Sequence, residues 1–80
     1  MQIPISTQSS VPISNQIASW FATAIARGDF DPGDTLPSIK QVALDNRVSP
    51  HFVRSAYEQL QADGVLTVQN EDFIVARLSS

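Results

Sequence analysis

Residues 36–64, with the sequence LPSIKQVALDNRVSPHFVRSAYEQLQADG, decide the fold of this 80-residue chain. We expect a short helix to begin at Ser38, a residue type that caps helices, and to end near Asn46, which tolerates the left-handed conformation. A second helix follows Ser49, which can cap it, with Pro50 at its first position, where the missing N–H does no harm. Two short helices joined by NRVS predict a helix-turn-helix.

The apolar residues of both helices recur at helical spacing, so each helix is expected to bury one face. Val48 is expected to fill the angle between the two helices, and Gly64 to end the second one. The residues expected to be buried are Ile39, Val42 and Ala43 in the first helix and Val53, Ala56, Tyr57 and Leu60 in the second.

The flanking segments predict one more helix and a hairpin. A helix is expected from Ser14, as its cap, to Gly28, and Pro32 with Gly33 reverses the chain after it. The runs VLTV and FIVAR, separated by QNED, predict a two-stranded hairpin. The apolar stripe of this helix near the N-terminus consists of Ile13, Ile17, Phe21, Ala24 and Ile25.

Together these elements predict a mainly α fold with a small β-hairpin, a winged helix-turn-helix. The domain is expected to occupy residues 13–80. Residues 1–12, rich in Ser, Gln and Thr, are expected to form an N-terminal arm. Ile3 and Ile5 of this arm are its spare apolar residues, and we expect them to contribute to association of the chain with a second copy.

Charge is unevenly distributed along a chain whose formal net charge is -3. Between positions 38 and 56, Lys40, Arg47 and Arg54 face a single acidic residue, Asp45, whereas the remainder has two basic and seven acidic residues. So few charges could also segregate by chance. If the pattern is meaningful, it indicates that the helix-turn-helix faces an anionic partner although the chain is acidic.

Composition argues against several functional classes. The chain has no cysteine and one histidine, and it lacks a Gly-rich phosphate loop, so we expect no metal site, no cofactor and no catalytic residues. The N-terminus lacks the basic and apolar regions of a secretory signal, and no apolar run approaches the roughly 18 residues of a membrane span. We therefore expect a cytoplasmic protein that is neither an enzyme nor membrane-bound.

The last helix of the motif leaves His51, Arg54, Ser55 and Glu58 opposite its buried stripe. Near the positive end of the helix dipole, the first three of these side chains can reach base edges or phosphates, and the hairpin would be the wing. The alternative is a plain helical domain whose polar face is only solvated.

Residues 12–66 closely resemble the winged-helix domain of GntR-type bacterial transcription regulators. The motifs that carry the likeness are GDFDPGDTLPS, the VSP that enters the last helix, and AYEQLQADGVL; LPSIKQVA and VSPHFV look most like the YtrA and MocR branches. The resemblance implies a regulator, expected to be a repressor, that reads double-stranded operator DNA with the helix around residues 50–63. It places Ser38, Lys40, Ser49, His51, Phe52, Arg54 and Ser55 at or near DNA, and the charge pattern adds Arg47.

Three departures from the family pattern bear on function. Lys40 stands where the family has arginine, so it keeps the charge without the bidentate fork. Phe52 stands where a threonine commonly touches phosphate, and its ring could instead pack on a sugar, a thymine methyl group, a protein partner or the core. The wing tip, Gln69-Asn70-Glu71-Asp72, is acidic and should repel phosphate. The alternative function is a protein–protein interaction module that uses Phe52 and this hairpin.

The same branches have further parts. The YtrA branch adds helices that dimerise the protein, and the MocR branch adds an aminotransferase-like domain; neither follows Ser80 in this sequence. We therefore expect no small-molecule effector domain in this chain, which is either an excised domain or a minimal regulator. A homodimer is expected because helix-turn-helix regulators bind paired half-sites.

Overall fold

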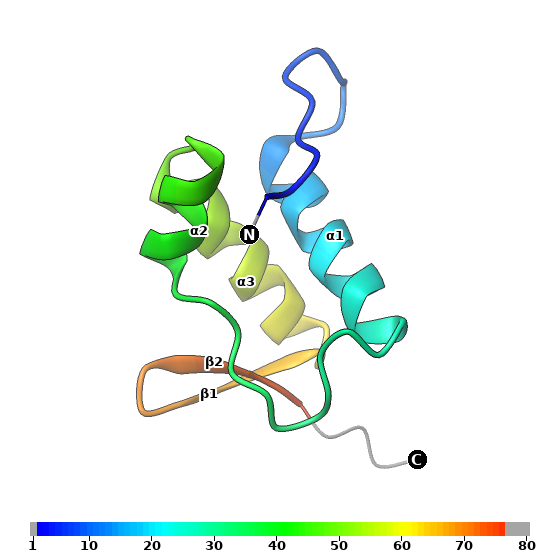
Figure 1. Ribbon diagram of the computed structural model, residues 1–80, viewed down its shortest axis with the longest axis vertical. Coiled ribbons are helices and arrows are strands. Elements are labelled where there is room, and N and C mark those ends of the chain that lie inside the picture. The colour runs from blue at the N-terminus through cyan, green and yellow to red at the C-terminus, as the bar shows by residue number, and fades with distance from the viewer. Residues whose placement is uncertain (1, 77–80) are drawn as a thin grey trace.

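The computed structural model describes residues 2–76. Three helices lie over a two-stranded antiparallel hairpin (Figure 1), which confirms the predicted winged helix-turn-helix architecture. In chain order the elements are α1 (Ile13–Ala26), α2 (Ile39–Asn46), α3 (Pro50–Ala62), β1 (Leu66–Gln69) and β2 (Asp72–Val75).

Helix α1 starts earlier than its sequence suggests. The cap position is Pro12, with extended backbone, so Ser14 lies inside the helix and the prediction that it caps α1 is wrong. The Pro12 carbonyl accepts from the Gln16 N–H at 3.1 Å. This hydrogen bond closes the first turn of the helix two residues before the position expected with Ser14 as the cap. The other end is as predicted, because Gly28 follows in the left-handed region at φ 87°.

The start of α2 is as predicted and its end is not. Ser38 caps the helix, because its Oγ accepts from the Gln41 N–H at 3.1 Å. The left-handed residue is Arg47, at φ 55°, whereas Asn46 stays helical as the last residue of α2. The Asn46 side chain is hydrogen-bonded to two backbone groups, the Ile3 N–H and the Val42 carbonyl. Asn46 therefore links the N-terminal segment to α2 and does not form the expected left-handed turn.

Helix α3 is capped by backbone geometry alone. Ser49 occupies the cap position with extended backbone, but its side chain makes no capping hydrogen bond, which corrects that part of the prediction. Pro50 at the first position and Gly64 at φ 81° after the last confirm the predicted ends. Because Pro50 fixes φ and lacks an N–H, the helix can start there without the hydroxyl.

The hairpin is tighter than the four-residue loop predicted from QNED. Gln69 pairs with Asp72, so only Asn70 and Glu71 form the turn, with φ of 51° and 69°. A two-residue hairpin loop with both residues at positive φ matches the right-handed twist of the strands. The predicted second strand also included Arg77, which lies outside the described residues.

The loop before α2 adds a third line of backbone to this sheet. Thr35 bridges Ile74 of β2, and the Leu36 N–H donates to the Phe73 carbonyl at 2.9 Å. Gly33, at φ 93°, donates its N–H to the Val75 carbonyl at 2.9 Å. The predicted turn at Pro32-Gly33 therefore docks α2 onto the hairpin.

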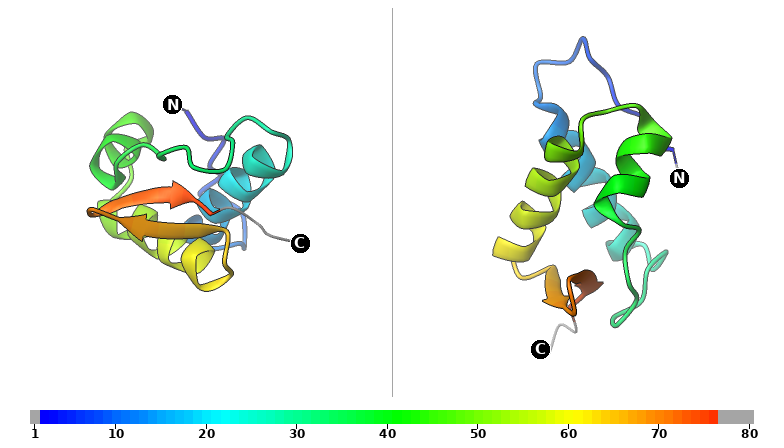
Figure 2. Two further views of the ribbon diagram at one scale, coloured as in Figure 1. Left: turned by 90° about the horizontal axis from the view of Figure 1, so that it is seen from below. Right: turned by 90° about the vertical axis from the view of Figure 1, so that its left-hand side faces the viewer.

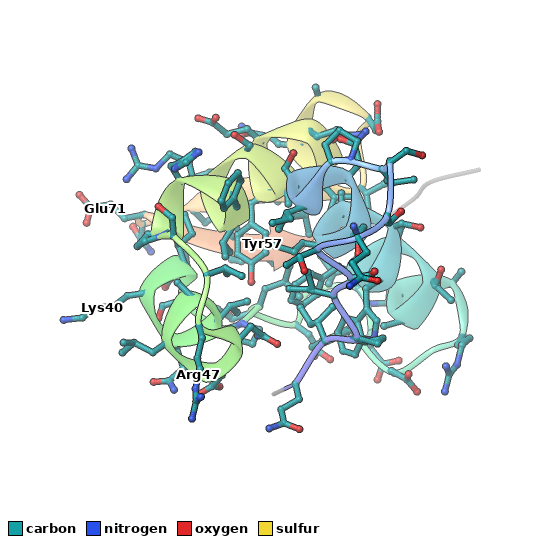
Figure 3. All side chains as sticks on the ribbon, turned by 90° about the horizontal axis from the view of Figure 1, so that it is seen from above. Lys40, Arg47, Tyr57 and Glu71 are labelled. Atoms are coloured by element: carbon teal, nitrogen blue, oxygen red, sulfur yellow. The ribbon has the colours of Figure 1, made fainter. Side chains whose placement is uncertain are left out.

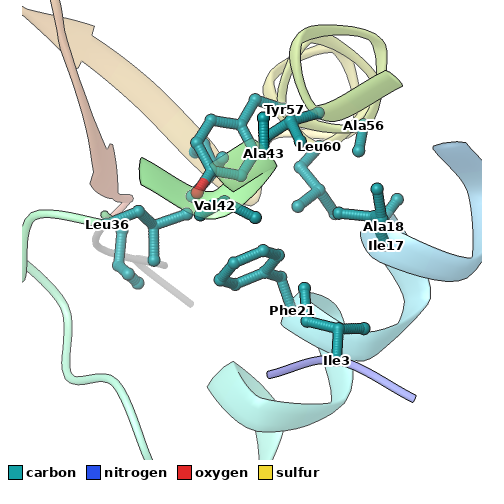
Figure 4. Close-up of a cluster of buried hydrophobic side chains, with 13 residues drawn as sticks. Ile3, Ile17, Ala18, Phe21, Leu36, Val42, Ala43, Ala56, Tyr57 and Leu60 are labelled. Carbon is teal, nitrogen blue, oxygen red and sulfur yellow. The ribbon is translucent and has the colours of Figure 1, made fainter. Parts of the chain in front are cut away.

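Buried side chains of the helices and the hairpin form one core, in which Figure 4 shows the rings of Tyr57 and Phe21. Tyr57 and Phe21 are fully buried with ring centroids 5.3 Å apart, and Phe73 of β2 packs edge-on to Tyr57 at 5.0 Å. Ile3 is only 7% exposed and belongs to the same cluster, so the prediction that it is spare for association is wrong. The predicted buried residues of α2 and α3 are confirmed, except that Ile39 is half-buried.

Tyr57→Phe should cost about 1 kcal/mol of unfolding free energy, because the Tyr57 hydroxyl donates to the Pro37 carbonyl at 2.8 Å inside the fold. Burial raises the pKa of Tyr57, so the stability that the neutral phenol contributes is complete below pH about 10 and is lost as pH rises further. Urea unfolding of both proteins at neutral and alkaline pH measures this. Equal alkaline loss of stability in Tyr57→Phe would contradict it.

Candidate nucleic-acid interface

Helices α2 and α3 and the hairpin share one side of the molecule, with α1 behind them (Figure 2, right). On α3 this side carries His51, Arg54, Ser55 and Glu58, all exposed and opposite the buried stripe, as predicted. We name six exposed side chains of this region the α2–α3 face, beside which the exposed carboxylate of Glu58 lies on α3. Its members are Ser38, Lys40, Ser49, His51, Arg54 and Ser55.

The N-terminal end of α3 holds its polar side chains in a local arrangement. The Ser49 Oγ lies 3.0 Å from the His51 Nδ1, so the hydroxyl that is not used for capping orients the imidazole. The His51 ring also packs against the Phe52 ring, with centroids 4.2 Å apart. Backbone N–H groups and the helix dipole make this end of a helix attractive to phosphate.

Phe52 is half-buried and packs against the hydrophobic core. This placement corresponds to the core alternative left open by the sequence, and it leaves only part of the ring available to a ligand. Its contact with His51 gives the ring a second task, which is to support the imidazole. No aromatic anchor projects freely from this end of α3.

The structure does not bring the three basic residues of the motif together. Lys40 reaches outward to the same side as Glu71 of the hairpin, whereas Arg47 extends in another direction (Figure 3). Lys40 lies in the first turn of α2 and Arg47 follows its last residue, which separates them by about 10 Å along the helix axis. Arg47 therefore belongs to a different part of the surface from the α2–α3 face.

The tip of the hairpin is negatively charged, whereas the α2–α3 face beside it carries positive charge. Glu71 and Asp72 are both exposed, and Glu71 is held in the left-handed region at φ 69°. Glycine is the preferred residue at this second turn position, so glutamate there is strained by about 1 kcal/mol or more. A polyanion would be attracted to Lys40 and Arg54 and repelled at this tip.

Among residues 2–76, no group of His, Cys, Asp and Glu side chains could hold a metal ion. No helix of the same range is both long and apolar enough to cross a membrane.

Comparison with known proteins identifies sequence relatives. Residues 13–72 match the family described as bacterial regulatory proteins, gntR family. The chain is similar to the HTH-type transcriptional repressor YtrA of Bacillus subtilis (strain 168), with 34% identity over 64 residues. That match covers 80% of this chain and 49% of YtrA, so the chain spans about half the length of this relative.

Solved structures share the fold. YtrA from Sulfolobus acidocaldarius, a GntR-family transcription factor, matches with a TM-score of 0.93 and 36% identity over 96% of this chain and 82% of that chain. AraR(DBD) in complex with operator ORE1 matches with a TM-score of 0.77 and 26% identity, covering 95% of this chain and 94% of that one. The second protein was solved with its operator bound.

Proposed function

The chain belongs to the gntR family of bacterial regulatory proteins, as its motifs predicted, and we propose that it binds double-stranded operator DNA to repress transcription. The supporting observation is that the exposed N-terminal end of α3 combines His51, Arg54 and Ser55 on a fold shared with an operator-bound domain. Two of its relatives are named HTH-type transcriptional regulator and HTH-type transcriptional repressor, which supports a role that is not enzymatic.

Within this proposal α3 enters the major groove. Arg54 and Ser55 lie on its exposed side, where their side chains meet base edges, and His51 meets either a base or a phosphate at the helix start. Lys40 contributes one phosphate contact as a point charge from α2, close to the capped end at Ser38. Ser49 acts by orienting His51.

Two predicted site residues have smaller parts in the proposal. Arg47 extends away from the α2–α3 face, so its contribution is a long-range attraction or a contact at the edge of the site. Phe52 supports His51 and offers only the exposed part of its ring to a sugar or a thymine methyl group.

We also propose that two copies bind one operator. Helix-turn-helix regulators place paired recognition helices about 34 Å apart, one turn of DNA. Ile3 is buried in its own chain, so a pairing contact would have to use other residues. A repressor of this kind acts in the cytoplasm, where bacterial DNA lies.

The other candidate function, a protein-interaction module using Phe52 and the acidic hairpin, is less well supported. A protein-binding hot spot usually presents an aromatic side chain that a partner buries. Here the Phe52 ring is already packed against the core and against His51. Of these two features, only the acidic tip is left for such a partner.

Selection from a library of randomised duplexes of about 30 base pairs, roughly three helical turns, tests the proposal. We expect enrichment of a common sequence, and gel shifts of that duplex at about 50 and 200 mM salt should give a slope near -3 per bound chain. About three basic side chains near phosphate account for that slope. No binding at about 50 mM salt, or a slope near zero, would contradict the proposal.

A further inference from the structure

The N-terminal segment is held against the domain although it has no regular secondary structure. Ile3 is 7% exposed within the core cluster, and the Ile5 N–H donates to the Ile3 carbonyl at 2.8 Å. The segment passes between the ribbons of α1 and α2 (Figure 3). We name residues 2–6 the strap.

The strap is tied to α1 by the side chain of Gln16. Its Oε1 accepts from the Ser6 N–H at 2.8 Å, and its Nε2 donates to the Ser6 carbonyl at 2.9 Å. The same Nε2 donates to the Val11 carbonyl at 2.9 Å, which closes the loop that leads into α1. One glutamine therefore fixes both ends of the loop at residues 6–11.

At its other end the strap is tied to the turn of the helix-turn-helix by Asn46. The Asn46 Oδ1 accepts from the Ile3 N–H at 2.7 Å, and the Nδ2 donates to the Val42 carbonyl at 2.9 Å. The residue after Asn46 is Arg47 in the left-handed conformation, and Ser49, the cap residue of α3, follows two residues later. The hydrogen bond thus meets the chain where its direction changes between α2 and α3.

We propose that the strap is a positioning element of the DNA-binding surface and that Asn46 is the positioning residue through which it acts. Arg47 adopts a backbone conformation that arginine rarely takes, so the turn needs support from its surroundings. The bond from Asn46 to Ile3 supplies it and fixes the direction in which α3 leaves α2. This inference rests on the proposed function, because it concerns how that function is positioned.

A positioning role and a purely stabilising role give different results. If the strap only stabilised the fold, a variant that remains almost fully folded would bind DNA as the parent does, because apparent affinity falls only by the folded fraction. If it positions α3, the affinity of the folded protein itself falls. Circular dichroism at low temperature gives the folded fraction of each variant.

A double-mutant cycle of Ile3→Ala and Asn46→Ala tests the link, with the selected duplex as the probe. Each single change should weaken binding by the folded chain about tenfold, and the double change by about tenfold as well. Asn46→Ala removes the hydrogen-bond acceptor, whereas Ile3→Ala keeps the backbone N–H and removes the buried side chain that holds it beside Asn46, so both changes act on one link. Gln8→Ala is the matched control, because Gln8 is an exposed residue of the same N-terminal segment, and it should leave affinity unchanged. Should Ile3→Ala not fold, Ile3→Val gives a smaller loss with the same non-additivity.

Two results would overturn the positioning role while DNA binding by the parent stands. One is additive losses, about a hundredfold in the double variant, which would show that the two residues act independently. The other is unchanged affinity of the folded single variants, which would leave the strap with a stabilising role only. A parent chain that selects no duplex would instead defeat the proposed function and this inference together.

Discussion

Arg54→Ala should weaken binding to the selected duplex by about 1–3 kcal/mol while leaving the unfolding free energy nearly unchanged. Arg54 is exposed on α3, whereas the neighbouring Val53 and Tyr57 are the fully buried residues, so removal of the Arg54 side chain opens no cavity. A guanidinium that donates two hydrogen bonds to a guanine contributes to affinity and to discrimination between bases. Loss of a bidentate base contact accounts for the upper part of the range.

Gel-shift titrations and urea unfolding of the same samples measure both quantities. Gln59→Ala is the matched control, because Gln59 is an exposed α3 residue that lies about 140° around the helix axis from Arg54. It should change neither quantity. An Arg54→Ala variant that binds as tightly as Gln59→Ala would exclude Arg54 from the recognition surface.

The double change Glu71→Lys with Asp72→Lys should tighten DNA binding on the order of tenfold or more at about 50 mM salt and steepen the salt dependence by up to about two. Both residues are exposed at the hairpin tip, and Lys40 on α2 reaches out to the same side as Glu71 (Figure 3). Each substitution replaces repulsion of phosphate by attraction. The fold should tolerate it, because the Gln69–Asp72 pairing is made by the backbone.

The control for the wing is a variant with the same net charge but unchanged tip. Asp31→Lys with Asp63→Lys alters two exposed acidic residues outside the hairpin. If only total charge matters, both double variants will gain equally, whereas a wing close to phosphate gains more at the tip. A tip variant that binds DNA no more tightly than the parent would place the wing away from the duplex.

The sequence predicted the elements whose signals are local. The stripe that includes Val53, Tyr57 and Leu60 recurs at helical spacing, and burial of all three confirms it. Gly28 and Gly64 end their helices because each has the positive φ that glycine accepts without strain. The family resemblance can also be recognised from the sequence, since its motifs lie in these same local segments.

Long-range contacts could not be predicted in this way. The bond between Ile3 and Asn46 joins residues 43 positions apart, so no window of the sequence contains both partners. The residue type of Asn46 favours the left-handed conformation, but the structure places Arg47 in it. Burial of Ile3 depends on partners far along the chain for the same reason, and the local signal for it is a second isoleucine, Ile5, two residues later in a polar segment.

The candidate site was only partly accessible from sequence. Helical periodicity correctly placed His51, Arg54 and Ser55 on the exposed side of α3. It could not show that Arg47 extends away from Lys40, because the path of the turn between α2 and α3 sets that direction. The pairing of Ser49 with His51 depends on side-chain rotamers, which periodicity does not specify.

An amide NMR titration of the chain with the selected duplex tests most directly whether α3 reads DNA. We expect the largest shift changes at residues 38–40 and 51–55, small ones at the turn of the hairpin, and none along the outer side of α1. Changes concentrated on α1 or the hairpin tip, with 51–55 unaffected, would contradict DNA recognition by α3.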